Sequence, residues 1–194
     1  MVKLNKIYTR TGDDGTTGLG SGKRVKKNAP RINLIGTIDE TNAHVGLARL
    51  HTQNMIDGTL DDMLARIQND LFDIGADLCL PGNEAEQADD KLRVSENQVS
   101  RLEAEIDTLN AELHPLTSFV LPGGTPAASH LHLARTVARR AERLAIELAD
   151  IKGEHISLPV LHYLNRLSDF FFVAARSAND NGAADVLWTP GENI

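Results

Sequence analysis

The sequence predicts an all-α protein, an antiparallel five-helix bundle that carries an N-terminal glycine-rich nucleotide-binding arm. From residue 32 onward apolar side chains recur at helical spacing, and no convincing period-two strand occurs beyond a possible short piece at 6–9. Short or moderate loops separate the predicted helices, which favours antiparallel neighbours. We expect one domain across the 194 residues, with the arm at 1–31, the bundle at 32–179 and a C-terminal tail at 180–194.

The first two helices are predicted at about 33–53 and 60–78, on either side of Asn, Asp and Gly punctuation at 54–58. In the first helix six apolar residues are expected to face the core: Leu34, Ile35, Ile38, Val45, Leu47 and Leu50. The second carries a continuous apolar stripe from Leu60 to Leu78. The acidic segment 81–90 contains Pro and Gly, so we predict a solvated loop.

The third helix is expected to begin at Ser95, which forms a capping box with Gln98, and to end near His114. The loop 117–126 places apolar residues beside two prolines, so it cannot be regular helix. The fourth helix is predicted at about 127–151 and the fifth at about 157–179, with Ser157 as its cap.

Charge and cysteine usage narrow the class of partner. Residues 1–31 hold eight Lys or Arg against two Asp, although the whole chain carries a net charge of −7. A small cationic region in an acidic protein suits a small polyanion better than nucleic acid. The single cysteine and the lack of a long apolar run predict a cytoplasmic protein with no membrane association.

The segment 8–18 reads Tyr-Thr-Arg-Thr-Gly-Asp-Asp-Gly-Thr-Thr-Gly and precedes a basic run at 23–27. Its glycines permit close backbone approach to a ligand and its threonines donate hydrogen bonds, so it is either a phosphate cradle or a mobile polar arm. It is not a P-loop, because Thr17 stands at the first glycine position. It is not a dinucleotide fingerprint, because Lys23 replaces the third glycine.

In the fourth helix Arg135, Arg139 and Arg143, here called the arginine ladder, recur every four residues. Like charges at this spacing repel, so the ladder needs anionic partners. These are either acidic helices, which the spacing alone slightly favours, or a polyphosphate. Asp39 is one acid that could pair with the ladder.

Three other polar features have less distinctive sequence patterns. Asn165 and Asp169 share a face of the fifth helix and either satisfy buried neighbours, the more common outcome, or reach a ligand. His130 and His132 are two apart and face different ways, which argues against a zinc pair. Cys79 has no local catalytic partner, so we expect it to be packed.

Five ordered segments resemble the trimeric, five-helix-bundle ATP:cob(I)alamin adenosyltransferases of the propanediol-utilisation type. They are 9–13 with Gly15, 36–42, 118–124, 135–143 and 165–169. The departures are small: Arg10 stands where Lys is common, Thr41 where Leu is usual, and Cys79-Leu80 where Ala-Thr is frequent.

The resemblance implies transfer of the 5′-deoxyadenosyl group of ATP to Co(I) of cob(I)alamin, with release of triphosphate and with Mg²⁺ as a cofactor. It implies a homotrimer with ATP at the subunit interfaces, an electron-donor reductase and an adenosylcobalamin-dependent acceptor enzyme. The metal attacks the ribose carbon itself, so no Ser, Cys or His nucleophile is needed. The alternative is a non-catalytic chaperone or sensor that binds nucleotide and corrinoid.

The resemblance also implies roles for individual residues. One subunit would hold the phosphates and adenosine with Thr9, Arg10, Thr11, Gly12, Thr16, Thr17 and Lys26. The neighbour would contribute Arg139, Arg140, Glu142, Arg143 and Asn165. Asp39 would pair with Arg135 across the interface, and Phe119 would occupy the space below cobalt and displace the lower axial base. No residue is assigned to Mg²⁺, because phosphates and water can supply its ligands.

Overall fold

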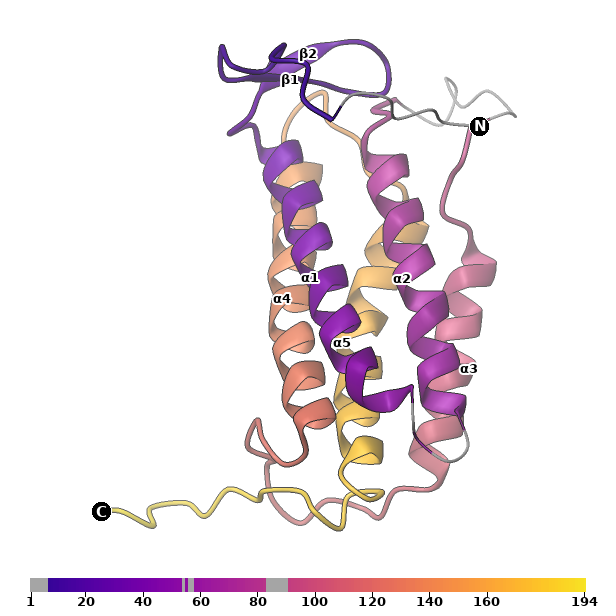
Figure 1. Cartoon of the computed structure of the whole chain (residues 1–194), viewed down its shortest axis with the longest axis vertical. Coiled ribbons are helices and arrows are strands. Elements are labelled where there is room, and N and C mark those ends of the chain that lie inside the picture. Colours follow the sequence, from indigo (N-terminus) through magenta and orange to yellow (C-terminus); the bar gives the residue numbers. More distant parts are fainter. Residues whose placement is uncertain (1–6, 54, 56–57, 83–90) are drawn as a thin grey trace.

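A computed structural model describes residues 7–53, 55, 58–82 and 91–194, and it contains the five predicted helices. Their bounds are α1 (Pro30–Thr52), α2 (Thr59–Leu78), α3 (Glu96–Ala111), α4 (Pro126–Ala149) and α5 (Leu158–Ala178). The helices run alongside one another, with the N-terminal arm over one end of the bundle and the C-terminal tail at the other (Figure 1). Most of the predicted loop 81–90 lies outside the described residues.

The helices share one apolar core, in which α4 packs against both α1 and α5, α1 against α2, and α3 against α5. The face of α4 opposite the ladder is lined by small side chains that are fully buried: Ala128, Ala134, Ala138, Ala141 and Ala145. Small side chains let neighbouring helix backbones approach closely. This packing fixes which face of α4 the arginines must occupy.

The prediction for α1 was wrong at two positions. Leu47 and Leu50, expected in the core, are 41% and 59% exposed. The apolar residues of α1 that face the core are Leu34, Ile38, Val45 and Ala48, all of them buried. At about 100° per residue, the other two leucines fall outside this stripe.

A short hairpin in the arm departs from the expected all-helical pattern. Strands β1 (Thr16–Gly18) and β2 (Arg24–Lys26) pair antiparallel, with Thr16 opposite Lys26. The possible strand at 6–9 is absent over Ile7–Thr9, and Lys6 lies outside the described residues. Strands of three residues are too short to produce a readable alternation, so the hairpin left no periodic signal.

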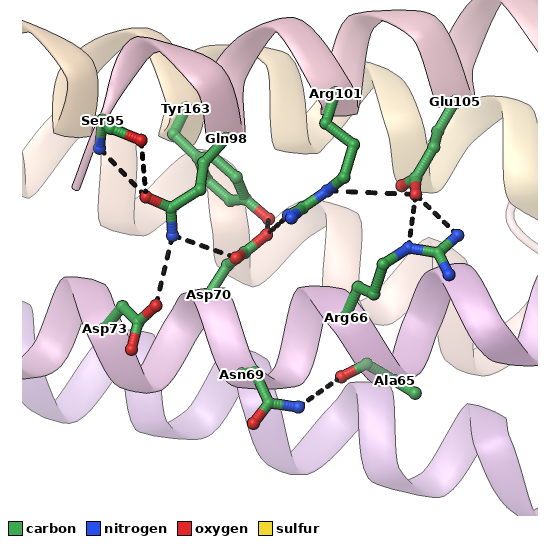
Figure 2. Close-up of polar contacts among 10 residues, drawn as sticks. All are labelled: Ala65, Arg66, Asn69, Asp70, Asp73, Ser95, Gln98, Arg101, Glu105 and Tyr163. Atoms are coloured by element: carbon green, nitrogen blue, oxygen red, sulfur yellow. Dashed lines mark hydrogen bonds and ion pairs between the residues drawn. The ribbon is translucent and has the colours of Figure 1, made fainter.

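A partly buried polar network joins α2, α3 and α5 (Figure 2). Tyr163, fully buried on α5, donates to Asp70 of α2 over 2.7 Å, and Arg101 of α3 pairs with the same carboxylate. Nearby, Arg66 of α2 pairs with Glu105 of α3 at 2.7 Å. Burial, together with the charge of Asp70, raises the pKa of Tyr163 well above its ordinary value. The network thus links α3 to α2 and α2 to α5 through polar contacts.

The helix caps agree with the sequence in part, and α3 ends at Ala111, before the predicted end near His114. The backbone N–H of Ser95 donates to the side chain of Gln98 over 2.9 Å, as a capping box requires. Ser157 occupies the N-cap of α5, but its side chain forms no capping bond. Among the helices of the described part of the chain, each is too short or too polar to cross a bilayer.

Candidate functional site

The arm is held in shape by its own hydrogen bonds. Arg24 donates to the Thr16 hydroxyl (2.9 Å from Nε) and to the carbonyl of Thr11 (2.6 Å). Thr16 in turn donates to Asp14 through its hydroxyl (2.7 Å) and its backbone N–H (2.9 Å). These two bonds, with a smaller contribution from the charge of Arg24, lower the pKa of Asp14. Sequence reasoning missed Arg24, although its place in the basic run between Lys23 and Lys26 was visible.

Two glycines of the arm have distinct structural roles. A Cβ at Gly12 would lie 3.0 Å from the Thr16 carbonyl oxygen, a tight contact that favours glycine in this turn. A Cβ at Gly20 would lie 2.8 Å from the Leu80 side chain, and its N–H donates to the Cys79 carbonyl over 2.8 Å. Gly20 therefore lets the arm pack closely against the end of α2. At this glycine the backbone approaches another part of the protein and not a ligand.

Arg31 fixes the start of α1 beneath the arm. It is 4% exposed, pairs with Glu154 at 2.5 Å and donates to the carbonyls of Leu78 (2.9 Å) and His155 (3.0 Å). These contacts tie the base of the arm to α2 and to the loop before α5. The arm thereby has a defined position on the bundle.

The arginines of α4 differ in whether they have an acidic partner. Arg140, beside the ladder, pairs with Glu40 of α1. Within the described residues, no carboxylate lies in ion-pair range of Arg135, Arg139 or Arg143; Arg143 donates to the backbone carbonyl of Arg139 over 3.2 Å. Burial and the nearby charge of Arg139 lower the pKa of Arg135. The acidic-helix alternative therefore accounts for Arg140 and leaves the ladder uncompensated.

Asn165 of α5 joins the polar face of the ladder. It donates to Glu142 over 2.7 Å and accepts from Arg166. Asn165 and Asp169 are both exposed, so the expectation of a buried network at these two residues was wrong. The amphipathic phase of α5 places them outward, because its aromatic residues take the core positions.

A cavity of about 400 Å³ lies beside the N-terminal half of α4 and is here called the Phe119 pocket. Its lining comes from the loop before α4, from α4 and from α5: Leu116, Thr117, Ser118, Phe119, Val120, Arg135 and Phe172. The Phe119 side chain is 76% exposed, so it is displayed to the pocket and not buried in the core. An exposed aromatic beside a cavity is a candidate ligand contact.

The tail forms the backing of the Phe119 pocket. The N–H of Trp188 donates to the Phe119 carbonyl over 2.8 Å, and that of Leu121 donates to Val186 over 2.7 Å. The Ser118 hydroxyl donates to the Trp188 carbonyl (2.6 Å), and the Phe119 and Trp188 rings lie 5.9 Å apart. Sequence reasoning treated 180–194 as a tail without a role. The apolar triplet Val-Leu-Trp in a polar terminus was the available signal.

A buried ion pair anchors this tail to α5. Arg176 pairs with Asp185 at 2.7 Å and also donates to the carbonyl of His114 over 2.9 Å. Asn179 donates to Asp185 over 3.1 Å and accepts from the N–H of Thr125 over 2.9 Å. Gly124, at φ 99°, sits against the Asn179 amide where a Cβ would clash. The loop and the tail are thus fixed to the same helix end.

Asp39 does not meet the ladder within one chain. It is exposed, and in the part of the chain that the structure describes it has no ion-pair partner. It lines a cavity of about 240 Å³ between α1 and α2, together with Phe72, which is 71% exposed, and Cys79. Cys79 is half-buried, and desolvation raises the pKa of its thiol, as expected of a packed cysteine.

The two histidines of α4 face different ways, as the sequence predicted. His130 stacks on His51 of α1 with 5.7 Å between ring centroids. His132 is buried and lies edge-on to Phe172. Over residues 7–53, 55, 58–82 and 91–194, no three His, Cys, Asp or Glu side chains are grouped to hold a metal ion.

The residues expected to bind ATP thus form two separate groups. Thr9, Arg10, Thr11, Gly12, Thr16, Thr17 and Lys26 lie in the arm, and Arg139, Arg140, Glu142, Arg143 and Asn165 lie on α4 and α5. For the described residues, no hydrogen bond or ion pair joins the two groups. Together with the Phe119 pocket, these features fit a helical-bundle protein that binds a polyanion beside a bulky ligand.

Comparison with known proteins is specific. The family model for cobalamin adenosyltransferase matches residues 7–178. A corrinoid adenosyltransferase of Mycobacterium tuberculosis (strain H37Rv) is 49% identical over 98% of this chain and 96% of its own length. One from Bacillus subtilis (strain 168) is 47% identical over 93% of this chain and 91% of its own length.

Solved structures agree. A single-residue variant of the PduO-type ATP:corrinoid adenosyltransferase from Lactobacillus reuteri, complexed with cobalamin and ATP, matches with a TM-score of 0.81 and 38% identity. The match covers 95% of this chain and 97% of that one. The chain therefore belongs to the cobalamin adenosyltransferase family, and its activity is ATP-dependent adenosyl transfer to a corrinoid. This supports the catalytic interpretation over the chaperone or sensor alternative.

Proposed function

We propose that Arg139 and Arg143 bind the triphosphate of ATP while the Phe119 pocket holds the corrinoid. The observation that carries this assignment is the contrast on α4: Arg140 has a carboxylate partner, whereas the described residues offer none to Arg139 and Arg143. An arginine that no acid neutralises is available for phosphate, which its planar fork can bind bidentately. Arg135, the ladder residue nearest the start of α4, lines the Phe119 pocket.

The arm would bind the same nucleotide from a second subunit. Its threonines, Gly12 and Lys26 lie over one end of the bundle, without polar contacts to the ladder within one described chain. A homotrimer with ATP at each interface brings an arm to a ladder, and Asp39 then pairs with Arg135 of the partner subunit. The exposed Leu47, Leu50 and Phe72 offer apolar area for such contacts.

In the reaction, Co(I) of the reduced corrinoid attacks the 5′ carbon of ATP, and triphosphate leaves. The protein's contribution is positioning and stabilisation of the leaving group, because Arg139 and Arg143 are placed before charge develops on the departing oxygen. Phe119 is apolar and cannot coordinate cobalt, so it suits the exclusion of an axial ligand from the lower face. Phosphate and water ligands would supply most of the coordination of Mg²⁺.

The chemistry also defines partners. The corrinoid must arrive reduced and the product is itself a cofactor, so an electron-donor reductase and an adenosylcobalamin-dependent acceptor enzyme belong on either side of this step. We place this exchange in the cytoplasm.

The direct test mixes the purified protein, ATP, Mg²⁺ and chemically reduced cobalamin. We expect the absorption change that accompanies formation of the cobalt–carbon bond, and a trimeric mass by light scattering. A monomer that turns over at the full rate would contradict the intersubunit site, whereas a trimer that binds both ligands without the spectral change would contradict the catalytic assignment.

A further inference from the structure

His132 is a buried polar residue whose polar atoms are unsatisfied. Its side chain is 1% exposed, and neither ring nitrogen has a hydrogen-bond partner among the described residues. Buried polar groups are almost always paired, because a buried donor or acceptor loses its hydrogen bonds to water. An apolar residue of similar size would avoid this penalty, so the imidazole at this position requires an explanation.

The position of His132 relates it to the Phe119 pocket. It lies one helical turn before Arg135 on α4, and its ring is edge-on to Phe172 of α5, with 6.4 Å between centroids. Arg135 and Phe172 are both part of the pocket lining. His132 therefore neighbours two of the residues that form the pocket wall.

Arg135 has a matching unsatisfied atom. Its Nε is buried and has no hydrogen-bond partner within the part of the chain that the structure describes. Side chains three apart on a helix lie on neighbouring positions of one face, and the charge of Arg135 acts on the His132 ring, so the two side chains are close neighbours. A neutral imidazole offers one acceptor nitrogen, whereas a protonated one offers none.

We propose that neutral His132 is a positioning residue, whose acceptor nitrogen binds Arg135 Nε when the corrinoid is bound and so aims the remaining guanidinium nitrogens out of the pocket wall. This inference rests on the proposed assignment of the Phe119 pocket to the corrinoid. The proposed bond divides the donors of Arg135 between two roles. Nε binds His132, and the Nη groups stay available to the ligand and to Asp39 of the partner subunit.

The surroundings favour the neutral form of the ring. Burial lowers the pKa of His132, the charge of Arg135 lowers it further, and Asp185 on the tail acts in the opposite direction. From α5, Phe172 contacts the ring and Arg176 already neutralises Asp185 at 2.7 Å. A protonated His132 would lose its acceptor and repel Arg135, so corrinoid binding should weaken on the acid side.

The test compares two substitutions at this position with one control. His132→Phe retains an aromatic ring against Phe172 but removes the acceptor, and His132→Gln restores an acceptor that does not titrate. His130→Gln, two residues away and stacked on His51 outside the pocket, is the matched control. Each purified variant is assayed for kcat and for the KM of ATP and of reduced cobalamin between about pH 5 and about pH 8.

We expect His132→Phe to raise the KM for corrinoid about tenfold while leaving the KM for ATP unchanged. His132→Gln should return to within about twofold of the parent and lose the acid-side rise in corrinoid KM. His130→Gln should match the parent throughout. A His132→Phe variant with the parental corrinoid KM overturns the proposal, and so does a His132→Gln variant that keeps the acid-side rise, a readout that remains even if His132→Phe does not fold.

Arg135→Ala separates this inference from the assignment beneath it. If Arg135→Ala leaves the corrinoid KM unchanged, the pocket assignment fails and the inference fails with it. If Arg135→Ala raises that KM while His132→Phe does not, the assignment stands and the positioning role of His132 alone is overturned.

Discussion

The two ends of the bundle are built by different means. At the arm end, exposed polar groups such as Arg24, Thr16 and Asp14 hold one another through hydrogen bonds, and glycines give the backbone its turns. At the tail end, a buried ion pair between Arg176 and Asp185 locks the chain under an exposed aromatic side chain. One end presents donors and charge, and the other presents an apolar surface with a rigid backing.

This difference matches the two substrates. A triphosphate is hydrophilic and binds to groups that stay partly hydrated until it arrives, so an exposed arm suits it. In the function proposed above, Phe119 excludes polar ligands from the lower face of the corrinoid, and that role would depend on where Phe119 is held. The main-chain bonds from Leu121 to Val186 and from Trp188 to Phe119 supply that support. Helix α4 connects the ends, with Arg135 toward the pocket and Arg143 toward the arm.

The largest effect should come from removing a charge that the proposed function assigns to the triphosphate. Arg139→Ala is expected to lower kcat by about 100-fold to about 1,000-fold, because a pre-placed donor to the leaving group is lost. The KM for reduced corrinoid should change little, as measured by the spectral assay at saturating ATP. Arg49→Ala is the control, since Arg49 pairs with Asp61 away from the ladder. An Arg139→Ala trimer with parental kcat would falsify the assignment.

At the tail end of the bundle, a substitution should impair use of the corrinoid and leave ATP binding unchanged. Phe119→Ala is expected to lower turnover of cobalamin that carries its lower base by about tenfold to about 100-fold, with ATP affinity unchanged. The side chain is 76% exposed, so the melting temperature should not fall as it would for a core phenylalanine. The rate is measured with Co(II) substrate and a biological reductant.

Leu158→Ala, an exposed apolar residue at the start of α5, is the matched control for Phe119→Ala. Its turnover and melting temperature should equal those of the parent. If Phe119→Ala loses ATP affinity in step with corrinoid turnover, the two ends are not independent and the comparison between them fails.

The sequence predicted the helices because burial dictates their pattern. Stripes such as that from Leu60 to Leu78 face the core over most of their length, and the structure confirms α2 there. The prediction from sequence was wrong at Leu47 and Leu50, because neighbouring helices determine which face of α1 is buried. It also missed β1 and β2, because strands of three residues are too short to show periodicity. Which face of α1 is covered depends on α4, and one segment's sequence does not contain that information.

The candidate site was predictable in its residue types and not in its contacts. The spacing of Arg139 and Arg143 identified a charged stripe, but their lack of a carboxylate partner among the described residues became evident only in the structure. The contact of Trp188 with Phe119 joins residues about 70 positions apart in the chain. The unpaired nitrogens of His132 depend on how α4, α5 and the tail pack around the ring, and a lone histidine in a helix gives no sign of them.

The smallest effect on activity is expected from a change that touches neither end. Tyr163→Phe removes the hydroxyl that donates to Asp70 over 2.7 Å inside the network of α2, α3 and α5 (Figure 2). We expect the free energy of unfolding to fall by about 1–3 kcal/mol, with kcat and both KM values unchanged. Urea unfolding at neutral pH gives the first quantity, and the spectral assay gives the others.

The same variant has a predicted pH signature. The folded state raises the pKa of Tyr163 above its unfolded value, so the unfolded chain releases this proton first and the parent's stability declines as pH rises above about 10. Tyr163→Phe should lack that part of the alkaline decline. If activity and stability fell together in this variant, α3 would have to transmit strain to the ladder through α5. The two ends would then be coupled through the core and not only along α4.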